Sequence, residues 1–499
     1  MSNGSEAEGT AAAGVSSSSS DTWARLILHL DPSRTFPGIT PVDGLFQPCA
    51  LFRGAENWLA RFANEEPHEL VRNIRQEVRA ISARWLKMQN VCVLVGAGAS
   101  QYVAKFAGAG LFDRAKSIIS GRPSELTLNA LLAHASRPGD IGKRFEEFLS
   151  QLSAVIRLSD GTDWPLDGLR VDVPLAGIRG ESARRARLKE LLSDLEKAVA
   201  VACNVFLPAS PLLGKGDILT THETFLAKLV ARDPQCGRAR IFTTNYDTLL
   251  EQAMDRLGIF YWDGFTGTAC RRFNPAAYDL DLHYPGEVTE GRVRRYDKVL
   301  LLYKLHGSIN WRRTEGLAPD PYGVFYDPRG LPTADETGTT GGTDALSTVF
   351  SGGQGLSILP TSAKYGETLA MPYAHLFRAM GQALREPQTV LFVIGYSGFD
   401  RHINRMIVDA LTNPGFTCVI VDPNPSEWAK GLCRADLCGR VYCFGGEWGK
   451  FEFFAQHVLP DLEVLKTEIA IARTLRDLQH ADKGFSGSGT KEETGGTGS

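Results

Sequence analysis

The sequence lacks a long apolar run, an excess of either charge, and paired cysteines. None of its apolar stretches approaches the roughly 20 residues that span a bilayer, so no membrane-spanning segment is expected. Lys and Arg number 54 against 57 Asp and Glu, and the net charge of -3 argues against nucleic acid or a membrane surface as the main partner. The 9 cysteines are scattered, and the start has no basic stretch followed by an apolar core. These absences predict a reduced, cytoplasmic protein.

The two ends of the chain contain few residues that can pack. Residues 1–21 are mostly Ser, Gly and Ala, and 483–499 are mostly Gly, Thr, Ser and charged residues, so we expect both to be disordered. Between them we expect a helical or irregular extension at 22–84, a main domain at 85–460 and an amphipathic helix at 461–482. The stretch 333–355, rich in Gly and Thr, is predicted to be a long loop.

The chain does contain short apolar runs that end in polar or glycine residues. Four such runs lie at 91–95, 241–243, 299–305 and 390–394, and two more at 416–421 and 439–444. Runs of this kind are typical of buried parallel strands, and an open sheet of such strands binds ligands at their carboxyl ends. We therefore predict an α/β fold with a Rossmann-like open parallel sheet of about six strands.

A long segment, 104–238, separates the first two predicted strands. A crossover between parallel strands needs only about a dozen residues. In the stretch 182–200, helical spacing places one set of apolar residues on a single face: Leu188, Leu191, Leu192, Leu195 and Val199. We expect a large helical insertion, which either forms a lid over the strand ends or packs against the edge of the sheet.

The residues after the first three runs are candidates for a binding site. The first run opens into Gly96, Ala97, Gly98, Ala99 and Ser100. Glycines let a backbone approach a phosphate, and Ser100 can cap the following helix. The third glycine of a dinucleotide motif is missing, because Gln101 holds its place, and the loop taken alone favours a plain strand-to-helix turn without a ligand.

The second and third runs deliver an amide, a carboxylate and an imidazole. Asn245 and Asp247 follow the second run, and His306 follows the third. Each has a local alternative, since Asn and Asp cap nearby amides in turns and a lone His before Gly is often structural. After the fourth run, Gly395, Ser397 and Asp400 lie before a predicted helix at 401–411, which Asp400 is expected to cap.

Taken in order, these motifs resemble the sirtuin (SIR2) superfamily over about 87–454. The motifs are the glycine loop, Thr244 to Asp247, Leu305-His306-Gly307, Gly395-Tyr396-Ser397 with Asp400, and Asp422-Pro423-Asn424. Within that superfamily the chain is most similar to bacterial SIR2-like proteins of antiphage defence. Neither the N-terminal extension nor the C-terminal tail is covered by the resemblance.

The resemblance implies NAD+ as the substrate and gives roles to the motif residues. Asn245 would orient a ribose hydroxyl or the attacking water, Asp247 would bind the nicotinamide carboxamide, and His306 would act as general base. The loop residues Gly96, Ala97, Gly98 and Ser100 would face the pyrophosphate. Gly395, Ser397 and Asn424 would bind the phosphate and adenosine ribose side.

Two departures from the protein-deacylating sirtuins matter for the reaction. Those enzymes carry a four-cysteine zinc module soon after the His-Gly motif, whereas here no cysteine occurs between Cys270 and Cys418, so no zinc ribbon and no metal are expected. The residues after the glycine loop, Gln101 to Lys105, also differ from the Arg and Asp that deacylases carry there. Without the module that helps to form the acyl-peptide cleft, water becomes the expected acceptor.

The sequence therefore predicts an NAD+ glycohydrolase that depletes the cofactor in infected cells. The alternatives are an NAD+-dependent deacylase or ADP-ribosyltransferase, and a non-catalytic sensor that binds NAD or ADP-ribose. Unregulated hydrolysis would kill the host, so we expect gating by a homo-oligomer or by a partner such as a HerA-like ATPase or an Argonaute-type protein. Neither sequence-specific nucleic-acid binding nor membrane association is expected.

Overall fold

The computed structural model describes most of residues 50–463. The segments it leaves out within that range are 63–66, 105–107, 136–140, 142–144, 160–177, 179, 215–217, 290–291, 314–321, 329–355 and 359–370. Both expected tails, the loop 333–355 and most of the expected helix 461–482 lie outside the described residues.

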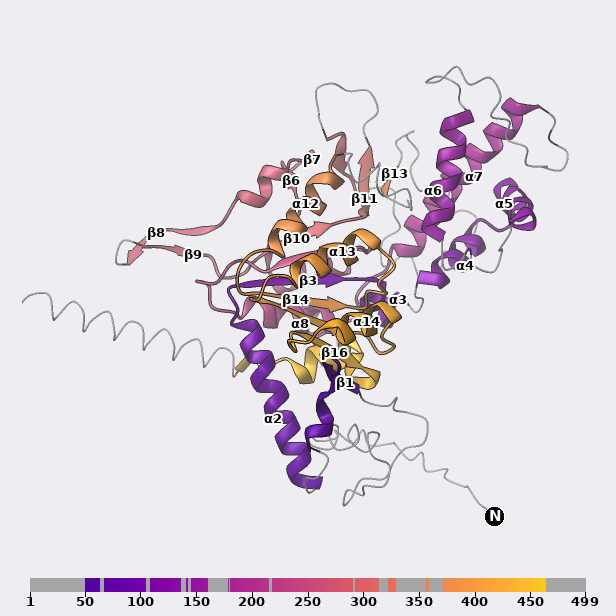
Figure 1. The fold of residues 1–499 in the computed structure, drawn as a ribbon. Coiled ribbons are helices and arrows are strands. Elements are labelled where there is room, and N and C mark those ends of the chain that lie inside the picture. Colours follow the sequence, from indigo (N-terminus) through magenta and orange to yellow (C-terminus); the bar gives the residue numbers. More distant parts are fainter. Residues whose placement is uncertain are drawn as a thin grey trace, which may run out of the picture.

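A nine-stranded sheet forms the centre of the fold, in the order β2-β1-β16-β15-β14-β3-β4-β10-β5 (Figure 1). Its parallel part consists of β3 (Asn90–Val95), β4 (Arg240–Thr243), β5 (Phe260–Trp262), β10 (Val299–Lys304), β14 (Thr389–Ile394), β15 (Phe416–Val421) and β16 (Val441–Gly445). At one edge β1 (Ala50–Arg53) pairs antiparallel with β16, and β2 (Glu56–Asn57) pairs with β1.

The order of the strands is that of a doubly wound fold. From β3 the chain moves outward to β4 and β10, and it then crosses back to β14, beside β3, before continuing outward to β15 and β16. The direction of winding thus reverses between β3 and β14. In open α/β sheets this reversal opens a crevice at the carboxyl ends of the two strands.

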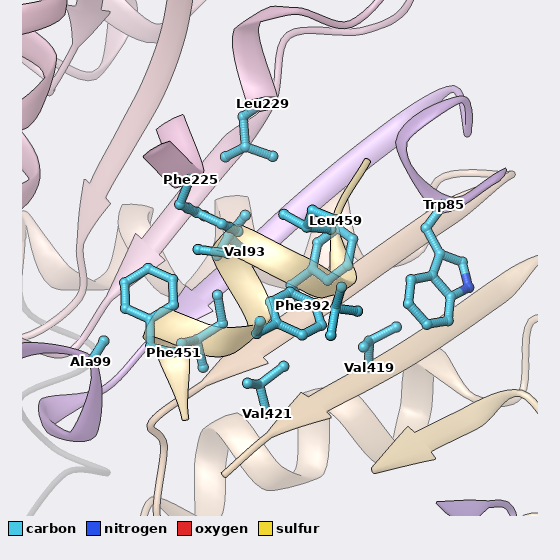
Figure 2. Packing of buried hydrophobic residues seen from close by; sticks show 14 of the residues in the cluster. Trp85, Val93, Ala99, Phe225, Leu229, Phe392, Val419, Val421, Phe451 and Leu459 are labelled. Atoms are coloured by element: carbon cyan, nitrogen blue, oxygen red, sulfur yellow. The ribbon is translucent and has the colours of Figure 1, made fainter. Parts of the chain in front are cut away.

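Both faces of the sheet are covered by helices, which explains why its strands are apolar throughout. One face packs against α2 (Pro67–Leu86), α8 (Thr221–Val230) and α9 (Leu249–Leu257), together with a π-helix at Phe454–Val458. Figure 2 shows part of this layer, in which Phe225 of α8 lies near Val93 of β3. The other face packs against α12 (Tyr373–Ala383), α13 (Arg401–Ala410) and α14 (Glu427–Ala435).

The segment between β3 and β4 forms a separate helical cluster. After the short α3 (Gln101–Ala104) come α4 (Gly108–Ile118), α5 (Pro123–His134), α6 (Phe145–Ser159) and α7 (Glu181–Cys203), of which the last four share one apolar core. That core includes Tyr246 and Ile309, which follow β4 and β10. The insertion therefore packs on the carboxyl-end side of the sheet. Helix α8, which the prediction placed in the same insertion, covers a face of the sheet instead.

The fold contains more strands than the predicted six. Besides β1, β2 and β5, a second sheet has the order β13-β11-β12-β7-β6, and β8 with β9 forms a separate hairpin that projects from the body in Figure 1. Their bounds are β6 Phe265–Thr266, β7 Arg271–Phe273, β8 His283–Thr289, β9 Arg292–Arg295, β11 Gly307–Arg313, β12 Val324–Tyr326 and β13 Leu356–Ile358. The extension at 22–84 likewise contributes β1 and β2, in addition to helix α2.

Candidate functional site

Asn245 lies just beyond the end of β4, and its side chain is held in place by residues of the loop that follows β3. Its amide nitrogen donates to the main-chain oxygen of Gly96 and to the hydroxyl of Ser100, both at 3.0 Å. Its main-chain N–H donates to Thr243 Oγ1 at 3.0 Å, and that hydroxyl donates in turn to Val95 O at 3.1 Å. The side chain is therefore fixed at the crevice that the strand order creates.

The orientation of this amide leaves one acceptor unused. Gly96 O can only accept a hydrogen bond, so the nitrogen of Asn245 must face it, and the Oδ1 atom points the other way. Asn245 is 8% exposed, and within the described part of the chain its buried Oδ1 atom has no hydrogen-bond partner. A buried acceptor without a partner is costly, which makes this oxygen a natural contact for an O–H or N–H group of a ligand.

Asp247 completes the same chain of hydrogen bonds. Ser100 Oγ, which accepts from Asn245, donates to Asp247 Oδ2 at 2.8 Å, and Leu249 N donates to Asp247 Oδ1 at 3.2 Å. Burial raises the pKa of Asp247, while the nearby Lys304 charge and the Ser100 hydroxyl act in the opposite direction. Each carboxylate oxygen retains capacity for a second donor.

Three glycines bring the loops after β3 and β14 into direct backbone contact. A Cβ atom on Gly96 would lie 2.5 Å from Gly395 O, and one on Gly98 would lie 2.7 Å from Gly395 Cα. The amides of Gly96 and Gly98 donate to Ile394 O and Gly395 O, both at 2.9 Å. These glycines are thus explained by the packing of two loops at the crevice, and their N–H groups are already engaged within the fold.

His306 lies just beyond the end of β10 and pairs with Asp400. The imidazole Nε2 atom is 3.2 Å from Asp400 Oδ2, and the two residues are 5% and 3% exposed. Asp400 also caps α13, as predicted, since its Oδ1 atom accepts from His402 N at 3.0 Å. An ionised carboxylate can only accept, so Nε2 carries a proton and the lone pair of the neutral ring lies on Nδ1.

This pair reaches across the crevice. Strands β10 and β14 are not neighbours, because β4 and β3 lie between them, and three strand spacings amount to roughly 14 Å. The contact between His306 and Asp400 therefore lies over the ends of the two strands that carry Asn245 and the glycine loop. The ring of Tyr246 lies 6.5 Å from that of His306, and Tyr246 is 6% exposed.

The remaining predicted contacts lie at the outer part of the same edge. Ala97 and Gly98 are exposed in the loop after β3, and Ser397 is exposed after β14. Asn424 is exposed after β15, where its N–H donates to Asp422 Oδ1 at 2.9 Å. All of the predicted residues thus follow carboxyl ends of parallel strands.

Sequence reasoning missed two features of the site. It favoured a helix cap for Asp400 and did not find the contact with His306, because a contact across 94 residues has no local signal. It also passed over Lys304, a lysine that ends the otherwise apolar or aromatic strand β10, and this residue contacts the main chain of Asp247.

The described residues contain no group of three or more His, Cys, Asp or Glu side chains that could hold a metal ion. Among the same residues, no helix is both long and apolar enough to cross a membrane.

Comparison with known proteins finds one family model that matches part of the chain. The model of the SIR2-like domain family matches residues 239–432, which include β4, β10, β14 and β15 but not β3 with its glycine loop. No curated protein matches the chain. Among solved structures, the chain is similar to one described as a crystal structure of a SIR2 homolog–NAD complex, at 11% identity and a TM-score of 0.34, over 78% of this chain and 94% of that one.

Proposed function

We propose that the chain is an NAD+ glycohydrolase, which converts NAD+ and water into nicotinamide, ADP-ribose and a proton; the match of residues 239–432 to the SIR2-like domain model supports this proposal. The observation that carries this proposal is the buried, unpartnered Oδ1 acceptor of Asn245 at the crevice. An acceptor placed there can hold the O–H of a ribose hydroxyl or of the attacking water.

The reaction does not need a strong general acid from the protein. Nicotinamide leaves NAD+ as a neutral molecule from a cationic ring, so the site has to orient the ribose, stabilise the developing oxocarbenium ion and direct water to it. In this proposal Asp247 supplies negative charge and an acceptor for the carboxamide. His306, oriented through Nε2 by Asp400, takes the proton of the water at Nδ1.

Water is favoured as the acceptor by the residues that come after His306. In this chain β11 begins directly at Gly307 and belongs to the second sheet. No cysteine occurs between Cys270 and Cys418, which leaves no ligands there for the zinc module expected of a deacylase. One zinc per chain in a metal analysis of the purified protein would contradict this argument and favour the deacylase alternative.

We extend the proposal to a cellular role as an NAD+-depleting effector of antiphage defence. This step is supported by the resemblance of the ordered motifs to those of bacterial SIR2-like defence proteins. Such an effector needs a gate, and we propose assembly into a homo-oligomer or activation by a HerA-like ATPase or an Argonaute-type protein. Turnover measured across protein concentration, alongside the mass from light scattering, tests the first of these gates. A monomer with full, concentration-independent activity would exclude it.

The reaction is tested by product analysis. Purified protein incubated with NAD+, with and without the product of the neighbouring gene, is expected to release nicotinamide and ADP-ribose in equal amounts without any added acceptor. Release that depends on an acceptor would show a transferase or deacylase. Binding without turnover under every condition would show a sensor.

The site is tested by two substitutions with matched controls. Asn245→Ala and His306→Ala are each expected to lower nicotinamide release on the order of 100-fold or more, because each removes a positioned group or base. The controls are Asn90→Ala, a buried Asn at the opposite end of β3, and His222→Ala, a buried His on α8. Wild-type turnover in either site variant would overturn the assignment.

A further inference from the structure

Lys304 occupies a position where the strand pattern calls for an apolar residue. In β10 the side chains of Leu300 and Leu302 pack on the face covered by α9, and Lys304 continues the same alternate row. Lys304 is only 3% exposed. Burial of an ammonium group costs several kcal/mol unless the charge is paired and hydrogen-bonded, so this lysine needs an explanation.

The partners of Lys304 explain how its charge is accommodated. Its Nζ atom lies 2.9 Å from Oε1 of Glu251, in the first turn of α9. The same Nζ atom donates to the main-chain oxygen of Asp247. In the described part of the chain, the buried Oε2 atom of Glu251 has no hydrogen-bond partner, so this ion pair is not embedded in a wider network.

An apolar residue would serve packing at least as well. Replacing a buried ion pair by hydrophobic residues of similar volume is often neutral or stabilising. What such a residue cannot do is donate a hydrogen bond to Asp247 O. That carbonyl belongs to the short connection between β4 and α9. The same connection carries the side chains of Asn245 and Asp247, two of the residues of the proposed site.

We propose that Lys304 is a positioning residue, whose ammonium group holds the Asp247 carbonyl and thereby fixes the connection between β4 and α9. This inference rests on the proposed function, which it deepens. Without the contact, Asn245 and Asp247 keep their local hydrogen bonds but lose the anchor that sets their direction relative to His306, two residues further along the same chain as Lys304.

The charge of Lys304 also acts on Asp247. Burial is the largest influence and raises the pKa of Asp247; Lys304 is the strongest influence that lowers it, with the hydroxyl of Ser100 and the amide of Leu249 acting in the same direction. Glu251 is the like charge that faces this carboxyl, and its influence is weaker than that of Lys304. Removing both members of the ion pair should therefore raise the pKa of Asp247 and move the acidic limb of activity to higher pH.

The test uses the double variant Lys304→Met/Glu251→Met, because a single change would leave an uncompensated buried charge. We expect it to melt close to the wild type. Hydrogen exchange of the amides at 244–248 should become faster, nicotinamide release should fall on the order of 10-fold to 100-fold, and the acidic limb of the pH profile should shift upward. The single variant Lys304→Arg keeps the charge and a donor. Compared with the double variant, it should regain part of the exchange protection at 244–248 and part of the wild-type pH profile.

A second buried lysine supplies the control. Lys228 is also 3% exposed, and it donates to the main-chain oxygens of Ala455, Gln456 and Leu459, which lie beyond β16 in the chain and away from the segment 244–248. Lys228→Met should change stability without affecting exchange at 244–248 or the pH profile. If the double variant matches the wild type in both exchange and pH profile, Lys304 serves packing alone. If the wild type releases no nicotinamide, the hydrolase proposal fails, while exchange at 244–248 still decides the role of Lys304.

Discussion

His222 links α3, the helix after the glycine loop, to α8, which covers one face of the sheet. It lies on α8, is 1% exposed, and its Nδ1 atom is 2.8 Å from the hydroxyl of Tyr102 on α3. Its ring meets that of Phe451 edge to face, with centroids 5.3 Å apart. Burial lowers the pKa of His222 to about 3, so the ring is neutral near pH 7 and shares a hydrogen bond with the hydroxyl of Tyr102 through Nδ1.

This lowered pKa predicts a loss of stability in acid. An unfolded histidine takes up a proton below about pH 6.5, whereas the folded one does so only near pH 3. Between these values the unfolded state binds more protons, so the free energy of unfolding falls as the pH falls, by up to about 1.4 kcal/mol per pH unit. Denaturant melts of His222→Gln from pH 7 to pH 4.5 should show a shallower slope than the wild type. His283→Gln, at an exposed position, should not; equal slopes in all three proteins would place the acid sensitivity elsewhere.

At the scale of single residues, the sequence indicates candidate site residues but not the residues that they contact. Asn245, Asp247 and His306 could be selected because polar residues directly after buried strands gather at one edge of a sheet. Their partners could not, since the hydrogen bonds to Ser100 and Asp400 join residues 145 and 94 positions apart. Such contacts depend on strand order, which no local pattern contains.

Among the elements, the contact between the loops after β3 and β14 is the tightest feature of the crevice. Gly395 has φ of +61° and a Cβ on it would overlap the amide nitrogen of Ala99. Gly258, at the end of α9, has the same φ of +61° with nothing within 4 Å of the position of a Cβ. A side chain at Gly258 would therefore meet backbone strain alone, whereas one at Gly395 would meet the same strain and a steric overlap.

Alanine at these two positions should have unequal effects. Gly258→Ala should cost about 1–2 kcal/mol for the left-handed backbone alone. Gly395→Ala should cost about 1–3 kcal/mol more, because the added methyl group forces the two loops apart. Urea denaturation measures both. Equal losses would show that the loops yield without cost and that their close contact is not important for stability.

The elements themselves were predictable to different degrees. Strands β3, β10, β14 and β15 follow from continuous apolar runs, and α7 from its periodic leucines, because burial dictates both patterns. Strands β1, β2 and β5 have two to four residues and lie at or near the edges of the sheet. Runs this short have no recognisable period, which is why the sheet is larger than the six strands predicted.

For the molecule as a whole, the N-terminal strands close one edge of the sheet. β1 pairs with every residue from Tyr442 to Gly445 of β16, and Leu51 is fully buried. Deleting residues 1–57 should expose this edge, since unpaired strand edges recruit other chains. Light scattering should then show polydisperse aggregates, whereas deletion of 1–21 should leave the size distribution unchanged. A monodisperse protein after the longer deletion would show that β1 and β2 are not needed to prevent aggregation.

On the proposed function, the pairing of His306 with Asp400 also determines at which stage of its synthesis the chain can become active. Asp400 follows β14, in the half of the sheet that is synthesised last, while Asn245 and His306 belong to the half synthesised first. A ribosome-bound chain that has not yet reached β14 can place the amide and the imidazole but not the carboxylate that orients the imidazole. On the proposed function, the chain would thus remain inactive during its synthesis, and a fragment ending at residue 388 should release no nicotinamide.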